Sequence, residues 1–519
     1  MRERGKGKGE MGQQKTAQGK TAQGKTAQAK TAQAKTAQKK TAQTLAKFLE
    51  SKRWFGEKGR GVLDANLRDV IPVTWPNARK DFAVGRARVT TDEGTFVYQL
   101  FLPGDDSIAE ALDDPEFRRG LADGFQNGAT FEKGGARWIV ASEGKTPLVV
   151  PATVPVTLSS SEQTNSSVII DGEAILKLYR KLEPGIHPDV EVTRFLTATG
   201  FVHVPVLLGT IRFEDSDGVT IAGMLQELVP GAVDGWTYAL DCSAGYFGAS
   251  EAREGGAMPF EAQATELGGV TREMHHSLAS GAAGTDFGPQ TATPDDMRRW
   301  VDHATRTIDR ACAALERALA EKRLPDDRVS EARAVMDRRS RYLAWTRQLA
   351  KEVGGDAGAN SRTHGDYHLG QVLRSAADRF LIIDFEGEPT RPLRERRARH
   401  SPLRDVAGML RSFAYAAAVG AGGVGSGVGG VGNPKPHSPN PKPAVLAEKW
   451  ESSIRAAFLR GYFSERNEPL ALLPRSQSNA GRLLSLFEAE KAFYELQYEM
   501  DHRPDWVWIP LRGIASLYS

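Results

Sequence analysis

The chain has 519 residues, of which 40% are hydrophobic and 26% charged, a composition that excludes a disordered protein and favours two or three soluble domains. The formal net charge of +3 hides an asymmetry, because residues 1–43 hold 11 basic and 2 acidic residues, whereas the remainder holds 57 and 63. Two distant cysteines exclude a disulfide framework, and no segment is apolar over a membrane-spanning length. We therefore expect a cytoplasmic protein with no membrane contact.

The first segment in chain order is a repeat: residues 15–43 contain KTAQ six times at a period of five. This period fits neither a helix nor a strand and offers no apolar face, so we expect residues 1–43 to form a disordered basic tail. The composition favours a solvated extension. A second role stays open, in which the tail binds polyanions weakly and loses them as salt rises.

The block after the tail is expected to form mainly strands, because it is rich in Val, Ile, Thr and aromatic residues. The clearest of these runs are Gly94–Leu102, Ala136–Ser142 and Thr146–Leu158.

From Ser166 the pattern predicts two strands around the turn DGE, then a proline-containing loop, and then a helix that carries Glu191. Helices are expected to dominate from about Trp236 onward. Residues 419–443 are rich in Gly and Pro, so we expect a loop inserted between two packed helices.

The motif with the clearest chemistry is THGDYHLGQVL at residues 363–373, followed by the apolar run FLII and Asp384. The order and spacing of Asp366, Gln371 and Asp384 are typical of the catalytic loop and metal-binding strand of protein-kinase-like phosphotransferases. This chemistry needs one carboxylate that orients and deprotonates the attacking hydroxyl, a role that fits Asp366. It also needs hard oxygen ligands for Mg²⁺, which Gln371, Asp384 and Glu386 offer.

Two further parts occur upstream in the expected order. Lys177 lies in a predicted strand and Glu191 in the following helix, which fits the Lys–Glu pair that holds the α and β phosphates of ATP. No glycine-rich phosphate loop precedes them. The run SSSEQTNSSV stands in its place, and its backbone N–H groups and hydroxyls, including that of Ser166, are candidate phosphate ligands.

These motifs make the sequence similar to the bacterial maltokinases, sugar kinases related to aminoglycoside phosphotransferases and folded like eukaryotic protein kinases. The resemblance runs from about Leu45 to Leu517, and the segments that carry it are KRWFGEKGR, AILKLYRKLEPGIHPDVEVTRFL, HGDYHLGQVL, residues 382–417 and EKAFYELQYEMDHRPDWVWIPLRGI. It implies an α+β, bilobal protein-kinase-like fold. The implied parts are a cap domain at 44–155, a β-rich N-lobe at 156–230 and a helical C-lobe at 231–519 that contains the insertion.

The resemblance also implies roles for individual residues, with ATP and Mg²⁺ as cofactors and a monomer favoured. Asp366 would be the base, and Gln371 and Asp384 would hold magnesium. The hinge that binds adenine would include Gln226, Glu227 and Leu228. Candidate sugar ligands are His368, Tyr494, Glu495, Tyr498 and Arg503, because aromatic rings stack on sugars and charged groups bind hydroxyls. The arginines between 391 and 399 are expected to pair with acids rather than to touch phosphate.

Three functions remain open at this point. The resemblance implies phosphorylation of maltose at its anomeric hydroxyl, giving maltose 1-phosphate for α-glucan (glycogen) synthesis. A kinase for another small sugar, glucosamine above all, is the nearest alternative. The alternative of another class is a pseudokinase-like binding protein with a polyanion-binding tail, although the complete set of Lys177, Glu191, Asp366, Gln371 and Asp384 argues against it.

Overall fold

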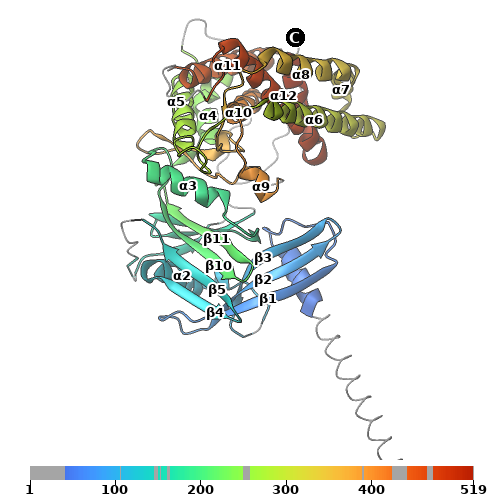
Figure 1. The fold of residues 1–519 in the computed structure, drawn as a ribbon. Helices are drawn as coiled ribbons and strands as arrows, with labels where there is room; N and C mark the ends of the chain where they lie inside the picture. The colour runs from blue at the N-terminus through green and yellow to red at the C-terminus, as the bar shows by residue number, and fades with distance from the viewer. Residues whose placement is uncertain are drawn as a thin grey trace, which may run out of the picture. The chain divides into compact units, whose positions relative to one another are not determined.

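The computed structural model describes residues 41–105, 107–144, 150–151, 153–159, 164–248, 257–388, 391–422, 441–464 and 472–517. The chain divides into two compact units (Figure 1). Unit 1 contains Met1–Ile186 and Leu208–Gln226, and unit 2 contains His187–Leu207 and Glu227–Ser519. Over the described ranges, no helix combines the length and the apolar character that a membrane span needs.

Unit 1 is built on two antiparallel sheets. The first has four strands in the order β1 (Asp64–Val73), β2 (Phe82–Thr91), β3 (Gly94–Pro103) and β9 (Lys181–Leu182). The second has seven strands in the order β4 (Ala129–Lys133), β5 (Ala136–Ser142), β10 (Leu207–Asp215), β11 (Gly218–Glu227), β8 (Ala174–Leu178), β7 (Ser166–Ile170) and β6 (Val156–Leu158).

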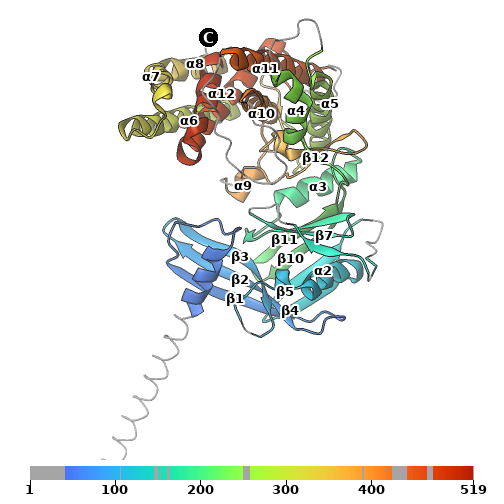
Figure 2. The same cartoon turned by 180° about the vertical axis from the view of Figure 1, so that it is seen from behind.

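Helices cover these sheets through apolar faces. Residues 41–51 are helical, and Leu45 and Leu49 from this helix join a buried cluster with Ala87 and Tyr98 of the first sheet. Helix α2 (Pro115–Asn127) packs on β5 and β6 of the second sheet (Figure 2). Asp114 caps its N-terminus: the Asp114 carboxylate accepts the Glu116 N–H, one of the backbone donors that have no partner within the helix.

Most of the predicted strands of unit 1 are confirmed, and one prediction is wrong in part. The predictions Gly94–Leu102 and Ala136–Ser142 coincide with β3 and β5, and the predicted hairpin after Ser166 is β7–β8. The prediction for Thr146–Leu158 is wrong at Val150–Pro151 and 153–155, since only Val156–Leu158 is a strand there, and residues 145–149 and 152 lie outside the described ranges. Pro147, Pro151 and Pro155 in this run lack the N–H groups that a strand ladder needs. The sequence also gave no indication of α2.

Unit 2 consists mainly of helices. They are α3 (Pro188–Thr199), α4 (Gly235–Phe247), α5 (Glu261–Leu278), α6 (Pro294–Ala320), α7 (Val329–Asp337), α8 (Arg339–Val353), α9 (Leu393–Arg396), α10 (Leu403–Ala421), α11 (Pro441–Tyr462), α12 (Gln477–His502) and α13 (Trp508–Leu517). Short strands form two small sheets, β12 (Val233–Asp234) with β15 (Val372–Arg374) and β16 (Phe380–Ile382), and β13 (Gln290–Thr291) with β14 (Ala359–Asn360).

The core of unit 2 fixes the helices around α12. Helix α12 packs against α6, α8, α10 and α13, and α5 packs against α11 (Figures 1 and 2). Large side chains interlock at these contacts, as where Trp300 of α6 meets Phe487 of α12 edge to face with ring centroids 5.3 Å apart. This packing sets which side chains of α12 reach the loop that contains Asp366.

The predicted helical class of unit 2 is confirmed, but the boundaries of some predicted segments differ by a few residues. Helices dominate after Trp236, as expected. Helix α10 continues to Ala421 and α11 begins at Pro441, so both enter the predicted loop at 419–443, whose residues 423–440 lie outside the described ranges. The predicted tail likewise lies outside them up to residue 40, while residues 41–43 belong to the first helix. The mixed helix-and-sheet class is confirmed.

Candidate active site

One buried carboxylate holds the backbone of the loop at 363–373, which contains Asp366. Asp405, on α10 and 2% exposed, accepts the backbone N–H groups of His364 at 2.7 Å and Gly365 at 3.0 Å. His275 of α5 lies 3.1 Å from the same carboxylate through Nε2. Burial would raise the pKa of Asp405, but these donors hold it below its ordinary value, so the group stays an anion. The loop backbone before Asp366 is therefore fixed.

Asp366 faces a lysine that the sequence did not single out. The Nζ of Lys491, on α12, lies 3.3 Å from Oδ1 of Asp366. Burial would raise the pKa of Asp366, and Lys491, His368 and His364 together lower it below its ordinary value. Burial also lowers the pKa of Lys491, but Asp366 and nearby acids raise it on balance. Asp366 is thus ionised at neutral pH, as a general base requires.

The Asp366 carboxylate opens onto a cavity of about 350 Å³ in unit 2. Lys491, Tyr494, Glu388, Arg391 and Glu490 are among the residues that line it. Its volume falls within the range of roughly 300–1,000 Å³ common for small-molecule sites. Most of the residues that line it have polar or charged side chains, which can hydrogen-bond a ligand with many hydroxyls.

The predicted magnesium ligands Gln371 and Asp384 lie on neighbouring segments. Gln371 ends the short 3-10 turn η3 (Leu369–Gln371), and its carbonyl accepts the N–H of Ile383 at 3.0 Å. Asp384 follows the buried strand β16 and has φ of +69°, an uncommon backbone conformation for a residue with a side chain. Such strain is often found at functional sites, and here it turns the chain immediately after the strand.

A cluster of three carboxylates includes two of the predicted ligands. Asp189, Asp384 and Glu386 each offer an oxygen atom, and these atoms lie within 4.8 Å of one another. Asp189 comes from the first turn of α3 and also accepts the N–H of Phe385 at 2.9 Å, so it braces the segment that carries the other two. An all-oxygen carboxylate set is the donor chemistry that Mg²⁺ prefers.

Glu191, two residues further along α3, has different partners. Its carboxylate binds Arg362 at 2.9 Å and Arg397 at 2.6 Å, and it is largely buried. Burial raises its pKa, but the two arginines lower it below the ordinary value. The partners found in unit 2 are therefore guanidinium groups, whereas the sequence analysis paired Glu191 with Lys177.

The remaining predicted nucleotide residues lie at strand ends. Lys177 is in β8, opposite Ser167 of β7, and Ser166 is the first residue of β7. Gln226 and Glu227 end β11, and the Glu227 N–H donates to Val206 O at 2.9 Å. Leu228 follows directly and is half-buried. Their assignment to ATP stays a prediction.

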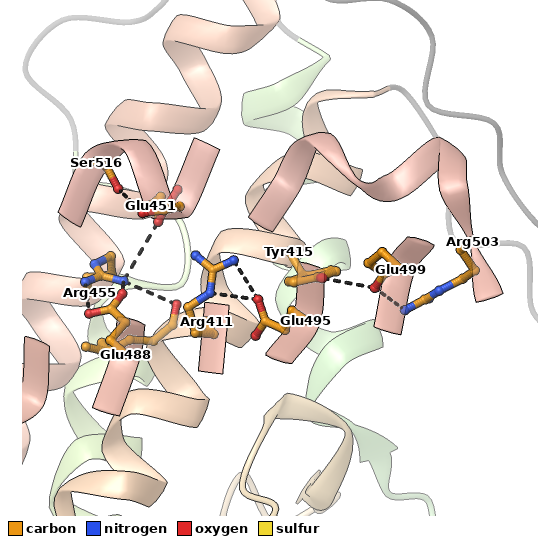
Figure 3. Close-up of polar contacts among 11 residues, drawn as sticks. Arg411, Tyr415, Glu451, Arg455, Glu488, Glu495, Glu499, Arg503 and Ser516 are labelled. Carbon is orange, nitrogen blue, oxygen red and sulfur yellow. Dashed lines mark hydrogen bonds and ion pairs between the residues drawn. The ribbon is translucent and has the colours of Figure 1, made fainter. Parts of the chain in front are cut away.

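The predicted sugar ligands on α12 separate into two groups. Tyr494 lines the cavity, and its ring lies 5.0 Å from Lys491 Nζ. Glu495 instead forms a buried ion pair with Arg411 at 2.7 Å, and Arg503 pairs with Glu499 at 2.6 Å (Figure 3). Tyr498 is exposed and stacks on His502, with ring centroids 4.3 Å apart. The structure therefore brings only Tyr494 of this helix set to the cavity that Asp366 lines.

His368 caps the turn that contains Gln371. Its Nδ1 accepts the Gly370 N–H at 3.1 Å, and burial holds its pKa below the ordinary value although Asp366 raises it. A neutral His368 ring can accept the Gly370 N–H, and this hydrogen bond stabilises the turn beside Asp366. Its assignment as a sugar ligand stays a prediction.

Two residues of the site were missed from the sequence. Lys491 stands one helical turn before Tyr494 and Glu495, so the spacing that suggested those residues could also have found it. Asp189 stands two residues before Glu191, and no sequence signal separates the two. The arginine prediction is confirmed at two positions, since Arg391 pairs with Glu388 at 2.6 Å and Arg397 with Glu191.

Residues 156–418 match the phosphotransferase enzyme family, and this match covers half of the sequence. The chain belongs to that family, and it has a kinase-like fold of mixed helix and sheet. The members of this family are enzymes that transfer phosphoryl groups. This activity agrees with the geometry of Asp366 and of the carboxylate cluster.

The chain is similar to two curated kinases. Glucosamine kinase of Mycolicibacterium smegmatis is 29% identical over 365 residues, which are 70% of this chain and 79% of that protein. Glucosamine kinase of Streptacidiphilus jiangxiensis is 27% identical over 365 residues, which are 69% and 72%. A solved glucosamine kinase in complex with glucosamine, ADP and inorganic phosphate has a TM-score of 0.60 and 20% identity, over 84% of this chain and 92% of that one. A structure of glucosamine kinase in crystal form A has a TM-score of 0.62 and 20% identity, over 91% of this chain and 98% of that one.

Proposed function

We propose that this chain is an ATP-dependent sugar kinase that transfers the γ-phosphoryl group to the anomeric hydroxyl of maltose, giving maltose 1-phosphate and ADP. One observation carries the proposal: the ionised Asp366 carboxylate lines a cavity large enough for a sugar, next to Lys491. The product would enter α-glucan synthesis, as the resemblance to maltokinases implies.

In this proposal Asp366 orients the sugar hydroxyl and accepts its proton as the oxygen attacks phosphorus. Lys491 keeps Asp366 ionised before the reaction and places a positive charge beside the oxygens on which charge develops. Asp405 holds the loop backbone, so that the carboxylate does not have to be repositioned during the reaction.

Magnesium fits the residues present. Asp189, Asp384 and Glu386 form an oxygen donor set of suitable spacing, and Gln371 lies on the neighbouring segment. When bound, Mg²⁺ would neutralise charge on the phosphates. Lys177, Ser166, Gln226, Glu227 and Leu228 are assigned to ATP, and Glu191 is assigned to anchoring α3 through its two arginines.

The charges of the cavity favour a neutral acceptor. Asp366 is balanced by Lys491, Glu388 by Arg391 at 2.6 Å, and Glu490 by Arg404 at 2.9 Å. The ammonium group of glucosamine needs a carboxylate whose charge is not already neutralised. Without one, the free-energy cost of removing the ammonium group from water is not offset by an ion pair. A neutral disaccharide needs only hydrogen-bond partners, which these paired groups still offer.

A second candidate acceptor is glucosamine, because both curated relatives are glucosamine kinases. Glu395 also lines the cavity and is exposed, so it provides one acid near the rim for an amino group. The two acceptors differ in length and charge, and therefore a direct comparison separates them.

The deciding experiment gives the purified chain ATP, Mg²⁺ and one of maltose, glucosamine or glucose. Release of ADP is measured for each sugar, and the product is identified by ³¹P and ¹H NMR, with Asp366→Asn as control. We expect maltose to have the highest kcat/KM, with phosphate at C1. Preferential use of glucosamine, or phosphate at C6, would overturn the acceptor assignment. No phosphorylation of any sugar would overturn the kinase proposal and favour the binding-protein alternative.

A further inference from the structure

A two-residue junction joins the sheets of unit 1. Strand β8 of the seven-stranded sheet ends at Leu178, and β9 of the four-stranded sheet begins at Lys181, so only Tyr179 and Arg180 lie between them. The buried Gln99 of β3 holds both: its N–H donates to Arg180 O at 2.7 Å, and its Nε2 donates to Tyr179 O at 3.2 Å. A shift of the four-stranded sheet would therefore move the end of β8.

The Arg180 side chain strengthens this junction. It is 1% exposed, its Nε donates to the Ser166 hydroxyl at 2.8 Å, and its guanidinium pairs with Glu110 at 3.2 Å. The guanidinium carbon also lies 4.5 Å from the ring centre of Trp54 and 4.9 Å from that of Phe101. A buried arginine is costly unless its charge and donors are matched, and here an acid, a hydroxyl and two rings match them.

The N-terminal motif KRWFGEKGR supplies part of this environment. Trp54 stacks on Arg180, and Glu57 binds the next residue, with its carboxylate 2.8 Å from Lys181 Nζ. Glu57 is buried and also accepts the Tyr98 hydroxyl at 3.2 Å. The N-terminal motif thus contacts two consecutive residues that follow β8, Arg180 and Lys181.

Two groups next to this junction, Lys177 and the Ser166 hydroxyl, are assigned to ATP in the proposed function. Lys177 lies three residues before Arg180 on β8, and Ser166, which receives the Arg180 hydrogen bond, pairs with Leu178 across β7–β8. We propose that Arg180 is a positioning residue for nucleotide binding, through which the N-terminal motif sets where Lys177 and the Ser166 hydroxyl stand. This inference rests on the proposed function, since that function assigns Lys177 and Ser166 to ATP.

The test measures nucleotide affinity without any sugar. Full-length Arg180→Met is compared with the wild type for binding of ADP with Mg²⁺ by calorimetry, and its melting temperature is recorded. We expect binding roughly tenfold weaker, because a displacement of binding groups by about 1 Å has effects of this order or larger. The KM for ATP should rise by a similar factor, while the KM for the sugar stays within about twofold of the wild type.

Arg86→Met is the matched control. Arg86 of β2 also joins the two sheets, since its guanidinium pairs with Asp215 of β10 and lies 5.1 Å from the ring centre of Phe213. Its partners are in β1 and β10 rather than in β7 and β8. Both variants should melt at a lower temperature than the wild type, but only the Arg180 variant should lose affinity for ADP.

Arg180→Lys decides the question if Arg180→Met does not fold. It keeps the charge but removes the planar donor set, so we expect a partial loss of ADP affinity, between the wild type and the methionine variant. Wild-type ADP affinity in a folded Arg180 variant, or equal losses in the Arg180 and Arg86 variants, would overturn the positioning role. A wild type that binds no ADP would overturn the proposed function and this inference with it.

Discussion

Helices α3 and α12 are far apart in the sequence. On each of them, residues close together in the chain differ in role, because one belongs to the candidate site and another forms a structural ion pair. On α3, Asp189 joins the carboxylate cluster, whereas Glu191 is held between two arginines. On α12, Lys491 meets Asp366, whereas Glu495 is paired with Arg411 inside the helical core. In both helices, residues two to four positions apart divide between the site and the packing.

The division differs in kind between the two helices. In α3 both neighbours are acids: Glu191 pairs with two arginines, whereas Asp189 lies within 4.8 Å of two other carboxylates. In α12 the separation is by face: Glu488, Glu495 and Glu499 form a row of ion pairs with arginines (Figure 3), and the neighbouring face carries Lys491 and Tyr494 to the cavity. The partners that the fold brings to each carboxylate therefore differ between close neighbours on one helix.

The largest effect is expected from Asp366→Asn, which tests the point where α12 meets the catalytic loop. The amide cannot accept the proton, so kcat should fall by roughly 10²- to 10⁴-fold with little change in melting temperature. Steady-state kinetics and thermal denaturation check this together. Turnover near that of the wild type would remove Asp366 from the role of base.

A smaller loss is expected from Lys491→Met. Without the ammonium group, burial raises the pKa of Asp366, so the acid limb of the pH–rate profile should move to higher pH. At neutral pH kcat should fall by roughly 10- to 100-fold, since a charged hydrogen bond at the site is lost. Lys449→Met, an exposed lysine on α11, is the matched control. An unchanged acid limb would contradict the pairing of Lys491 with Asp366.

The two acids of α3 can be separated by their metal dependence. Asp189→Asn should raise the Mg²⁺ concentration for half-maximal activity by roughly tenfold, because an oxygen donor loses its charge. Glu191→Gln should leave that concentration within about twofold and instead lower the melting temperature, because the buried Arg362 and the partly exposed Arg397 lose a charged partner. Magnesium titrations of both variants check this. The opposite pattern would exchange the roles of the two residues.

The smallest effect on activity is expected from Glu495→Gln. Removing one partner of a buried ion pair leaves Arg411 uncompensated, which should cost about 3–5 kcal/mol of stability. The KM for the sugar and kcat should stay near wild-type values at a temperature where the protein is folded. Urea denaturation and kinetics measure the two quantities. A large rise in KM without loss of stability would return Glu495 to the set of sugar ligands.

Much of the core motif could be predicted from the sequence because it is local. Asp366 and Gln371 come before the short strand β15, and Asp384 comes after its partner strand β16, so a short stretch of chain contains all three residues. The FLII run also predicts the buried strand before Asp384. The hairpin around Asp171 and Gly172 is also local, and both residues have the positive φ that such a turn requires.

The missed residues depend on contacts between distant segments. Lys491 lies 125 positions from Asp366, and Asp189 lies 196 positions from Phe385. Nothing in the spacing along α12 shows that Glu495 faces Arg411, because Tyr494 and Glu495 are equally plausible neighbours in one dimension. Helix packing alone decides which of them reaches the cavity.

The most direct test of the account is one ³¹P NMR time course of ATP, Mg²⁺ and maltose with three proteins: the wild type, Asp366→Asn and Glu495→Gln. We predict that a C1 sugar phosphate forms with the wild type and at a similar rate with folded Glu495→Gln, and that it is almost absent with Asp366→Asn. Sugar phosphate formed by Asp366→Asn at the wild-type rate would contradict the assignment of Asp366 and of the cavity beside it.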